Sequence, residues 1–174
     1  QAMFSDDALL EQLVLKGGNA MALVHQKMYQ SESKNDIGIK PYIKDLVEEI
    51  KNSLQIKKEV QIHTHIEDVK LNIATAIPLG LILNELITNS FKHAFQDITK
   101  PEIKINLLHT AQGMIRLTVK DNGKGFADSH NPKPESLGLI LINSLCEQID
   151  GTHFFEYNKG LEFSVLFPAI LQSK

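Results

Sequence analysis

The sequence predicts a two-layer α/β sandwich, in which a mixed or antiparallel sheet of about five strands packs on about three helices. Three observations lead to this fold class. Short segments alternate apolar and polar residues, as half-buried strands do. Longer segments repeat apolar residues at helical spacing. The two kinds of segment do not alternate one by one along the chain, as a doubly wound sheet would require.

The strand segments are predicted from their alternation and from the turns beside them. They cover residues 60–66, 103–107, 115–119, 153–157 and 161–167. The turn-prone pair Gln112-Gly113 separates the second and third, so these read as an antiparallel pair. Asn158, Lys159 and Gly160 join the last two in the same way.

Helices are predicted over residues 41–54, 77–95 and 137–149. A further long amphipathic helix is predicted upstream, over about residues 5–30, where Ser5 is a suitable N-terminal cap. The polar segment 31–38 reads as a loop. We therefore expect a boundary near residue 35, which separates residues 1–34 from a main domain over residues 35–174.

Composition excludes several classes of function. The chain has 174 residues and a formal net charge of -3, with its cations dispersed, so nucleic acid is an unexpected partner. The single cysteine, Cys146, excludes an intrachain disulfide framework and fits a cytoplasmic setting. No apolar run is expected to approach the roughly 18–20 residues needed to cross a bilayer. Because the chain starts at Gln1 in mid-pattern, we expect a fragment whose full-length protein could be membrane-anchored.

The helix at 77–95 combines an apolar stripe with a polar face. Glu85, Asn89, Lys92 and His93 follow one another at three- and four-residue spacing and therefore project from neighbouring turns. Together they could hold Mg²⁺ and the phosphates that it bridges. The alternative is an ordinary solvated helix face, which periodicity alone favours.

Two glycine-containing segments follow. Asp121 ends a strand before Asn122-Gly123-Lys124-Gly125-Phe126, so its carboxylate could accept a hydrogen bond from an exocyclic amine; the alternative is a common Asp-Asn-Gly turn. The polar, proline-punctuated segment 126–136 reads as a mobile lid. Beyond it, Ser136-Leu137-Gly138-Leu139 opens a helix whose unpaired backbone N–H groups suit phosphate oxygens. Neither a dinucleotide fingerprint nor a P-loop occurs.

Residues 84–95, 121–126 and 136–145 resemble, in order and spacing, the N, G1 and G2 boxes of the GHKL ATPase superfamily. That superfamily has the Bergerat fold and includes histidine kinases, DNA gyrase, Hsp90 chaperones and MutL proteins. Residues 20–32 look like the end of the dimerisation hairpin of histidine kinases with a HisKA_2-type phosphoacceptor domain. By this resemblance, residues 1–34 are the remaining second helix of that hairpin. The resemblance, which spans nearly the whole chain, therefore implies the HATPase_c catalytic domain of a two-component sensor histidine kinase.

By this resemblance Asn89 coordinates Mg²⁺, Lys92 and His93 meet the phosphates of ATP, and Asp121 binds the adenine amino group. Glu85 stands where related ATPases carry a catalytic carboxylate, so Glu85, Lys92 and His93 form the expected catalytic set. The other residues expected at the nucleotide are Gly123, Gly125, Phe126, Leu137, Gly138, Leu139 and Ser164.

The resemblance also implies partners, namely ATP and ADP, a phosphoacceptor histidine, a response regulator and a second copy of the full-length chain. None of the 7 histidines has the neighbours of a phosphoacceptor, so we do not expect this fragment to autophosphorylate alone. The sequence departs from the family pattern at two positions that bear on nucleotide affinity. The G2 box has one glycine, Gly138, and Leu161 stands where relatives often have a threonine. Ser164 could supply a hydroxyl nearby, or it could be an ordinary strand residue.

Two other functions fit the same boxes. An ATPase or serine kinase of the anti-sigma type shares them but lacks the helix predicted upstream. A degenerate adaptor would keep the fold and a dimerisation surface but would not bind nucleotide. Titration with an ATP analogue and Mg²⁺ distinguishes the adaptor from the enzymes.

Overall fold

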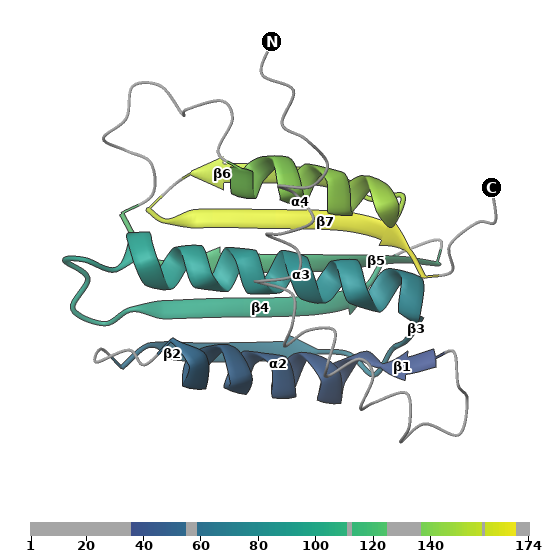
Figure 1. Ribbon diagram of the computed structural model, residues 1–174, viewed down its shortest axis with the longest axis horizontal. Coiled ribbons are helices and arrows are strands. Elements are labelled where there is room, and N and C mark those ends of the chain that lie inside the picture. The colour runs from purple at the N-terminus through teal and green to yellow at the C-terminus, as the bar shows by residue number, and fades with distance from the viewer. Residues whose placement is uncertain (1–35, 55–58, 111–112, 125–136, 158, 170–174) are drawn as a thin grey trace, which may run out of the picture.

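The structure is a computed structural model that describes residues 36–54, 59–110, 113–124, 137–157 and 159–169. Its centre is a five-stranded sheet with the order β2-β4-β5-β7-β6 (Figure 1). The strands are β2 (Gln61–Ile66), β4 (Glu102–His109), β5 (Met114–Asp121), β6 (Thr152–Tyr157) and β7 (Leu161–Pro168). Strand β2 pairs with β4 in parallel and the other neighbours pair antiparallel, which confirms a mixed sheet.

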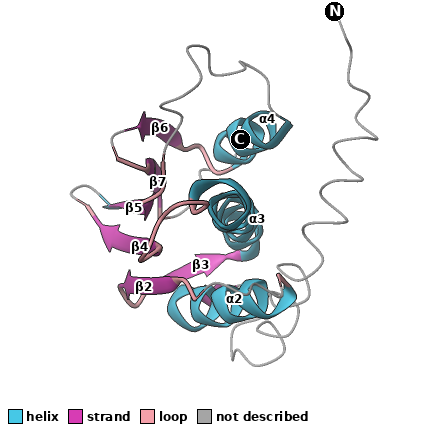
Figure 2. Cartoon of the chain, turned by 90° about the vertical axis from the view of Figure 1, so that its left-hand side faces the viewer, coloured by secondary structure: helices cyan, strands magenta, loops and turns pink. Residues whose placement is uncertain are grey.

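Three α-helices of the described residues lie on one side of this sheet (Figure 2). They are α2 (Ile39–Ser53), α3 (Ile73–Asn89) and α4 (Leu137–Gln148), and a π-helical turn, η1 (Ser90–Ala94), continues α3. Alternate residues of each central strand face the helices and are buried, as the sequence alternation predicted. The buried residues of β4, β5 and β7 on this face are Ile103, Ile105, Leu107, Ile115, Leu117, Val119, Phe163, Val165 and Phe167. The predicted two-layer sandwich is confirmed.

Helix α3 is the core helix and contacts both α2 and α4. It begins at Ile73, four residues before the predicted start, because the side chain of Asn72 caps it by accepting a hydrogen bond from the Thr75 backbone N–H at 2.9 Å. The run Ile73–Ala94 is long and apolar enough to span a membrane by composition, which the sequence analysis did not anticipate. Since 67% of its most apolar window is buried inside the domain, packing in the core accounts for this composition.

A second, smaller sheet was not predicted. Strand β1 (Asp36–Gly38) pairs antiparallel with β3 (Lys70–Asn72), and the Ile39 backbone N–H donates to the Val69 carbonyl at 2.9 Å, which anchors the start of α2. Strands of three residues are too short to show a period in the sequence. The helix predicted over 5–30 and the lid predicted over 126–136 lie outside the described residues, and the domain boundary near residue 35 stays a prediction.

Candidate functional site

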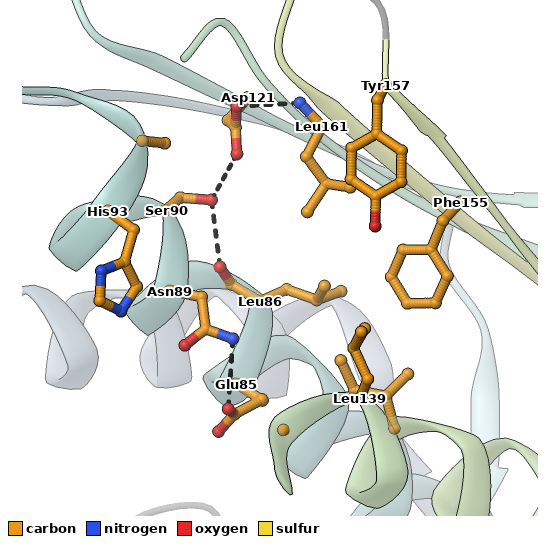
Figure 3. Close-up of a pocket in the computed structure, with 13 residues that line it drawn as sticks. Glu85, Leu86, Asn89, Ser90, His93, Asp121, Leu139, Phe155, Tyr157 and Leu161 are labelled. Carbon is orange, nitrogen blue, oxygen red and sulfur yellow. Dashed lines mark hydrogen bonds between the residues drawn. The ribbon is translucent and has the colours of Figure 1, made fainter. Parts of the chain in front are cut away.

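A cavity of about 320 Å³ lies between α3, η1, α4 and the adjoining ends of β5, β6 and β7 (Figure 3). Apolar side chains form most of its walls, and polar side chains occupy its two ends. The lining residues are Glu85, Leu86, Asn89, Ser90, His93, Ala94, Asp121, Gly138, Leu139, Ile142, Phe155, Tyr157 and Leu161.

Asp121 forms one polar end of the cavity. It is the last residue of β5, and only 4% of its surface is exposed. Its Oδ1 atom accepts hydrogen bonds from the backbone N–H groups of Gly123 at 2.9 Å and Leu161 at 3.1 Å. Its Oδ2 atom accepts a hydrogen bond from the Ser90 hydroxyl at 2.7 Å. A carboxylate offers about four lone-pair sites, so Asp121 retains acceptor capacity toward the cavity.

Glu85 and Asn89 form the other polar end. They lie one turn apart on α3, and the Asn89 Nδ2 atom donates to Glu85 Oε1 at 3.2 Å. This bond orients the carboxamide, since its nitrogen faces the carboxylate and its oxygen is turned elsewhere (Figure 3). Gly138, the second residue of α4, packs directly against this pair, and a Cβ atom there would collide with Glu85 Oε1 and lie 3.5 Å from Asn89 Nδ2.

The π-helical turn η1 decides which residues after Asn89 reach the cavity. His93 lines it, whereas Lys92 is exposed and does not. In a π-helix each residue advances by a smaller rotation than in an α-helix, so the third residue after Asn89 turns away from its face and the fourth stays close to it. The carbonyl of Ala94, at the end of η1, accepts a hydrogen bond from the Lys124 backbone N–H at 3.1 Å. This contact joins η1 to the segment after β5.

The structure brings together most of the residues that the sequence nominated. Those that line the cavity are Glu85, Asn89, His93, Asp121, Gly138 and Leu139. Gly123 adjoins it, because its N–H binds Asp121 and a Cβ atom there would collide with Ala94. Leu137 is the first residue of α4. Gly125 and Phe126 lie outside the described residues.

Besides Gly123 and Leu137, two described residues that the sequence nominated, Lys92 and Ser164, do not line the cavity. Lys92 turns away for the reason given above. Neighbouring residues of a strand point to opposite faces of a sheet. Leu161, Phe163 and Val165 of β7 face the helices, so Ser164, which lies between Phe163 and Val165, faces the other way. It pairs with Thr118 on β5 and Phe154 on β6 and lies on the face without helices. The expectation that Ser164 lies beside the nucleotide is therefore not supported by its position.

Sequence reasoning missed several lining residues. Ser90 lies on the apolar stripe of the helix predicted over 77–95 and was not nominated, and the aromatic residues Phe155 and Tyr157 were assigned only to a strand. Phe155 also packs on Phe163, with ring centroids 5.0 Å apart. Tyr157 is 44% exposed, and burial of the rest of its side chain raises the pKa of its hydroxyl. A hydroxyl within an otherwise apolar stripe was the one signal that could have indicated Ser90.

The arrangement suits a planar, partly apolar ligand that carries an amino group at one end and an anionic group at the other. The apolar walls can cover a flat ring, and the Asp121 carboxylate can accept from its amino group. Among the described residues no three His, Cys, Asp or Glu side chains cluster as a metal site.

The comparison with protein families decides the identity. The family model described as "histidine kinase-like ATPase domain" matches residues 48–160. The chain belongs to this family. A second family model, described as "histidine kinase", matches residues 18–56 of the chain. This match agrees with the HisKA_2-type resemblance of residues 20–32. These two matches confirm the resemblance to a sensor histidine kinase ATPase domain that the sequence motifs indicated.

Curated relatives of this histidine kinase-like ATPase domain are themselves histidine kinases. Blue-light-activated histidine kinase 2 of Erythrobacter litoralis (strain HTCC2594) is 24% identical over 97 residues, covering 55% of the chain and 28% of that protein. Sensor histidine kinase YdfH of Bacillus subtilis (strain 168) is 32% identical over 101 residues, covering 56% of the chain and 24% of that protein. The chain thus spans about a quarter to a third of the length of the curated relatives it matches.

Solved structures share the fold. The histidine kinase domain of the Erythrobacter litoralis EL346 blue-light-activated histidine kinase has a TM-score of 0.77 at 21% identity, covering 88% of this chain and 73% of that one. The catalytic domain of histidine kinase ThkA has a TM-score of 0.64 at 16% identity, covering 79% of this chain and 97% of that one. At these identities the likeness supports the fold, and the roles of individual residues depend on the cavity.

Proposed function

We propose that this histidine kinase-like ATPase domain binds Mg²⁺-ATP in the cavity and transfers the γ-phosphate to a phosphoacceptor histidine of the same or a partner chain, for relay to a response regulator. The observation that carries the proposal is that Asn89 and Asp121, far apart in sequence, line one continuous cavity with an apolar middle. A cavity of this kind can hold a base at one end and phosphates at the other.

The base would lie at the Asp121 end. The remaining acceptor capacity of Asp121 suits an exocyclic amino group, and Leu139, Phe155 and Leu161 offer apolar surface to the ring. At the other end of the cavity, Gly138 and the N-terminal turn of α4 lie against the Glu85–Asn89 pair and would allow anionic oxygens to approach closely. Of these residues, Phe155 and Leu161 lie outside the sequence motifs, so they support the binding of a flat ring independently of the motifs.

The phosphates and the cation would lie at the Asn89 end. The bond from Asn89 Nδ2 to Glu85 leaves the carboxamide oxygen as a ligand for Mg²⁺. His93 is exposed at the cavity and can donate to a phosphate oxygen, and we propose that the exposed Lys92 reaches the phosphates from outside the described cavity. Glu85 orients Asn89, and its acceptance of a proton from the attacking imidazole is part of the proposal.

Catalysis would depend mainly on positioning and on neutralisation of charge, as in other phosphoryl transfers. The cation, when bound, supplies the positive charge that stabilises the transferring group. The residues of the chain hold the two ends of the nucleotide at a fixed separation. We further propose that the full-length protein is a homodimer and that this domain works in the cytoplasm without binding nucleic acid.

Calorimetric titration with a non-hydrolysable ATP analogue and Mg²⁺ tests the proposal. We expect binding by the parent, loss of the Mg²⁺-dependent part of the affinity in Asn89→Ala, and weaker binding of the base in Asp121→Asn. Asn52→Ala, which changes an exposed asparagine of α2, is the matched control and should bind as the parent does. Absence of binding by the parent, with Asn89→Ala indistinguishable from it, would instead favour the degenerate adaptor.

A further inference from the structure

Ser90 occupies an unusual place for a small polar residue. It is the first residue of η1, only 4% of its surface is exposed, and it lines the cavity beside Asp121. Its neighbours on the same helix, Leu86 and Ile87, are buried apolar residues. A buried hydroxyl in such surroundings costs free energy unless it forms a hydrogen bond. The hydrogen-bond partners of the Ser90 hydroxyl therefore determine what its burial costs.

The hydroxyl has two acceptors within reach but one proton to donate. Ser90 Oγ lies 2.7 Å from Asp121 Oδ2 and 3.1 Å from the Leu86 carbonyl oxygen. The Leu86 carbonyl already accepts the Ser90 backbone N–H. A carboxylate is also the stronger acceptor, and hydrogen bonds to it are shorter. The proton of Ser90 is therefore directed at Asp121.

This bond completes the fixation of the Asp121 carboxylate. Oδ1 is held by two backbone N–H groups, from Gly123 and Leu161, and Oδ2 is held by Ser90 (Figure 3). With a donor on each oxygen, the carboxylate cannot rotate without losing a hydrogen bond. Ser90 supplies the sole side-chain donor among these three contacts, so it is the one that substitution can remove.

We propose that Ser90 is a positioning residue that holds Asp121 with its open acceptor toward the base, and that it thereby sets the preference of the site for a purine with a 6-amino group. The inference rests on the proposed function, because it concerns how the same cavity discriminates among nucleotides. Ser90 acts through Asp121 and does not itself touch the amino group.

The test compares two ligands in the presence of Mg²⁺, a non-hydrolysable ATP analogue and the matching analogue of purine riboside triphosphate, which lacks the 6-amino group. Calorimetry gives the ratio of the two affinities. In Ser90→Ala we expect the affinity for the ATP analogue to fall about tenfold, the effect of one hydrogen bond to a charged group, while the amino-free analogue loses less than about threefold. Ser90→Thr, which keeps the hydroxyl, should restore the ratio.

Two controls separate this role from a structural one. Ser53→Ala removes another helix-end hydroxyl, which donates to the Ile50 carbonyl at 2.9 Å away from the cavity, and should leave the ratio unchanged. If Ser90→Ala does not fold, Ser90→Cys, of similar size but a weak donor, takes its place. Equal losses for both ligands would overturn the inference while leaving the proposed function intact. A parent that binds neither ligand would overturn the proposed function and, with it, the inference.

Discussion

Replacing Gly138 with alanine should separate the stability of the domain from its ability to bind nucleotide. The new Cβ atom would collide with Glu85 Oε1 and lie 3.2 Å from Glu85 Cδ. Glu85 is only 2% exposed, so its carboxylate has little room to move aside. The simplest adjustment rotates the carboxylate and breaks its bond from Asn89 Nδ2. Asn89 then loses the group that orients its carboxamide.

Opposing effects on the free energy of unfolding set the magnitude. Losing a hydrogen bond to a buried charged group costs about 1.5–3 kcal/mol. Alanine in place of glycine within a helix returns about 1 kcal/mol. We therefore expect the free energy of unfolding to fall by about 0.5–2 kcal/mol, which leaves the domain folded. The affinity for a Mg²⁺-ATP analogue should fall at least about tenfold, since both polar groups at that end of the cavity are displaced.

Urea unfolding measures the first quantity and calorimetry the second. Gly38→Ala is the matched control, because a Cβ atom at Gly38 would come no closer than 3.5 Å to Pro41, an ordinary contact. Its affinity should equal that of the parent. If Gly138→Ala bound the analogue as tightly as the parent, the assignment of the Glu85–Asn89 pair to the site would be refuted.

Three further predictions concern the core and the surface. Tyr42→Phe should raise the free energy of unfolding by about 1 kcal/mol in urea, because the buried Tyr42 hydroxyl has no partner among the described residues; a decrease would contradict this. Burial raises the pKa of the Cys146 thiol to about 12, so a thiol reagent at neutral pH should label it only as urea unfolds the chain, and rapid labelling of the native domain would contradict this. Hydrogen bonds with His109 lower the pKa of the Glu67 carboxyl group, and the bond from the His109 backbone N–H has a larger effect than the bond with its side chain. The stability this gives is present above the ordinary glutamate pKa and is lost as pH falls through the lowered pKa, so Glu67→Gln should reduce the loss of stability in acid; equal pH dependence in the variant and the parent would contradict it.

The elements that the sequence predicted well are those buried on one side only. Residues of β4 and β5 alternate because one face meets the helices, and this burial is recorded directly in the order of the residues. The start of α3 was placed too late because its cap, Asn72, lies before the periodic segment, and Pro78 lies inside the helix. Strands β1 and β3 were missed because three residues do not establish a period.

The candidate site was predicted at its two ends but not in its walls. Asn89 and Asp121 stand in motifs whose residues are close in sequence. Phe155 and Tyr157 reach the cavity only because β7 pairs with β5 and carries β6 beside it, which is a long-range arrangement. Lys92 was placed by α-helical spacing, and the π-helical turn changes that spacing. Local patterns therefore nominated residues at both polar ends of the cavity but missed most residues of its apolar walls.

The hydrogen bonds of Asp121 give it a structural role in addition to the role proposed for it in ligand binding. Through Leu161 it fastens the first residue of β7, and a Cβ atom at Gly160, where φ is +122°, would lie 2.9 Å from the Asp121 carbonyl carbon. A side chain at position 121 without this acceptor would lose the bond to the first residue of β7 together with the contact proposed for the ligand. Redesign of the cavity at position 121 would therefore have to include the hairpin of β6 and β7.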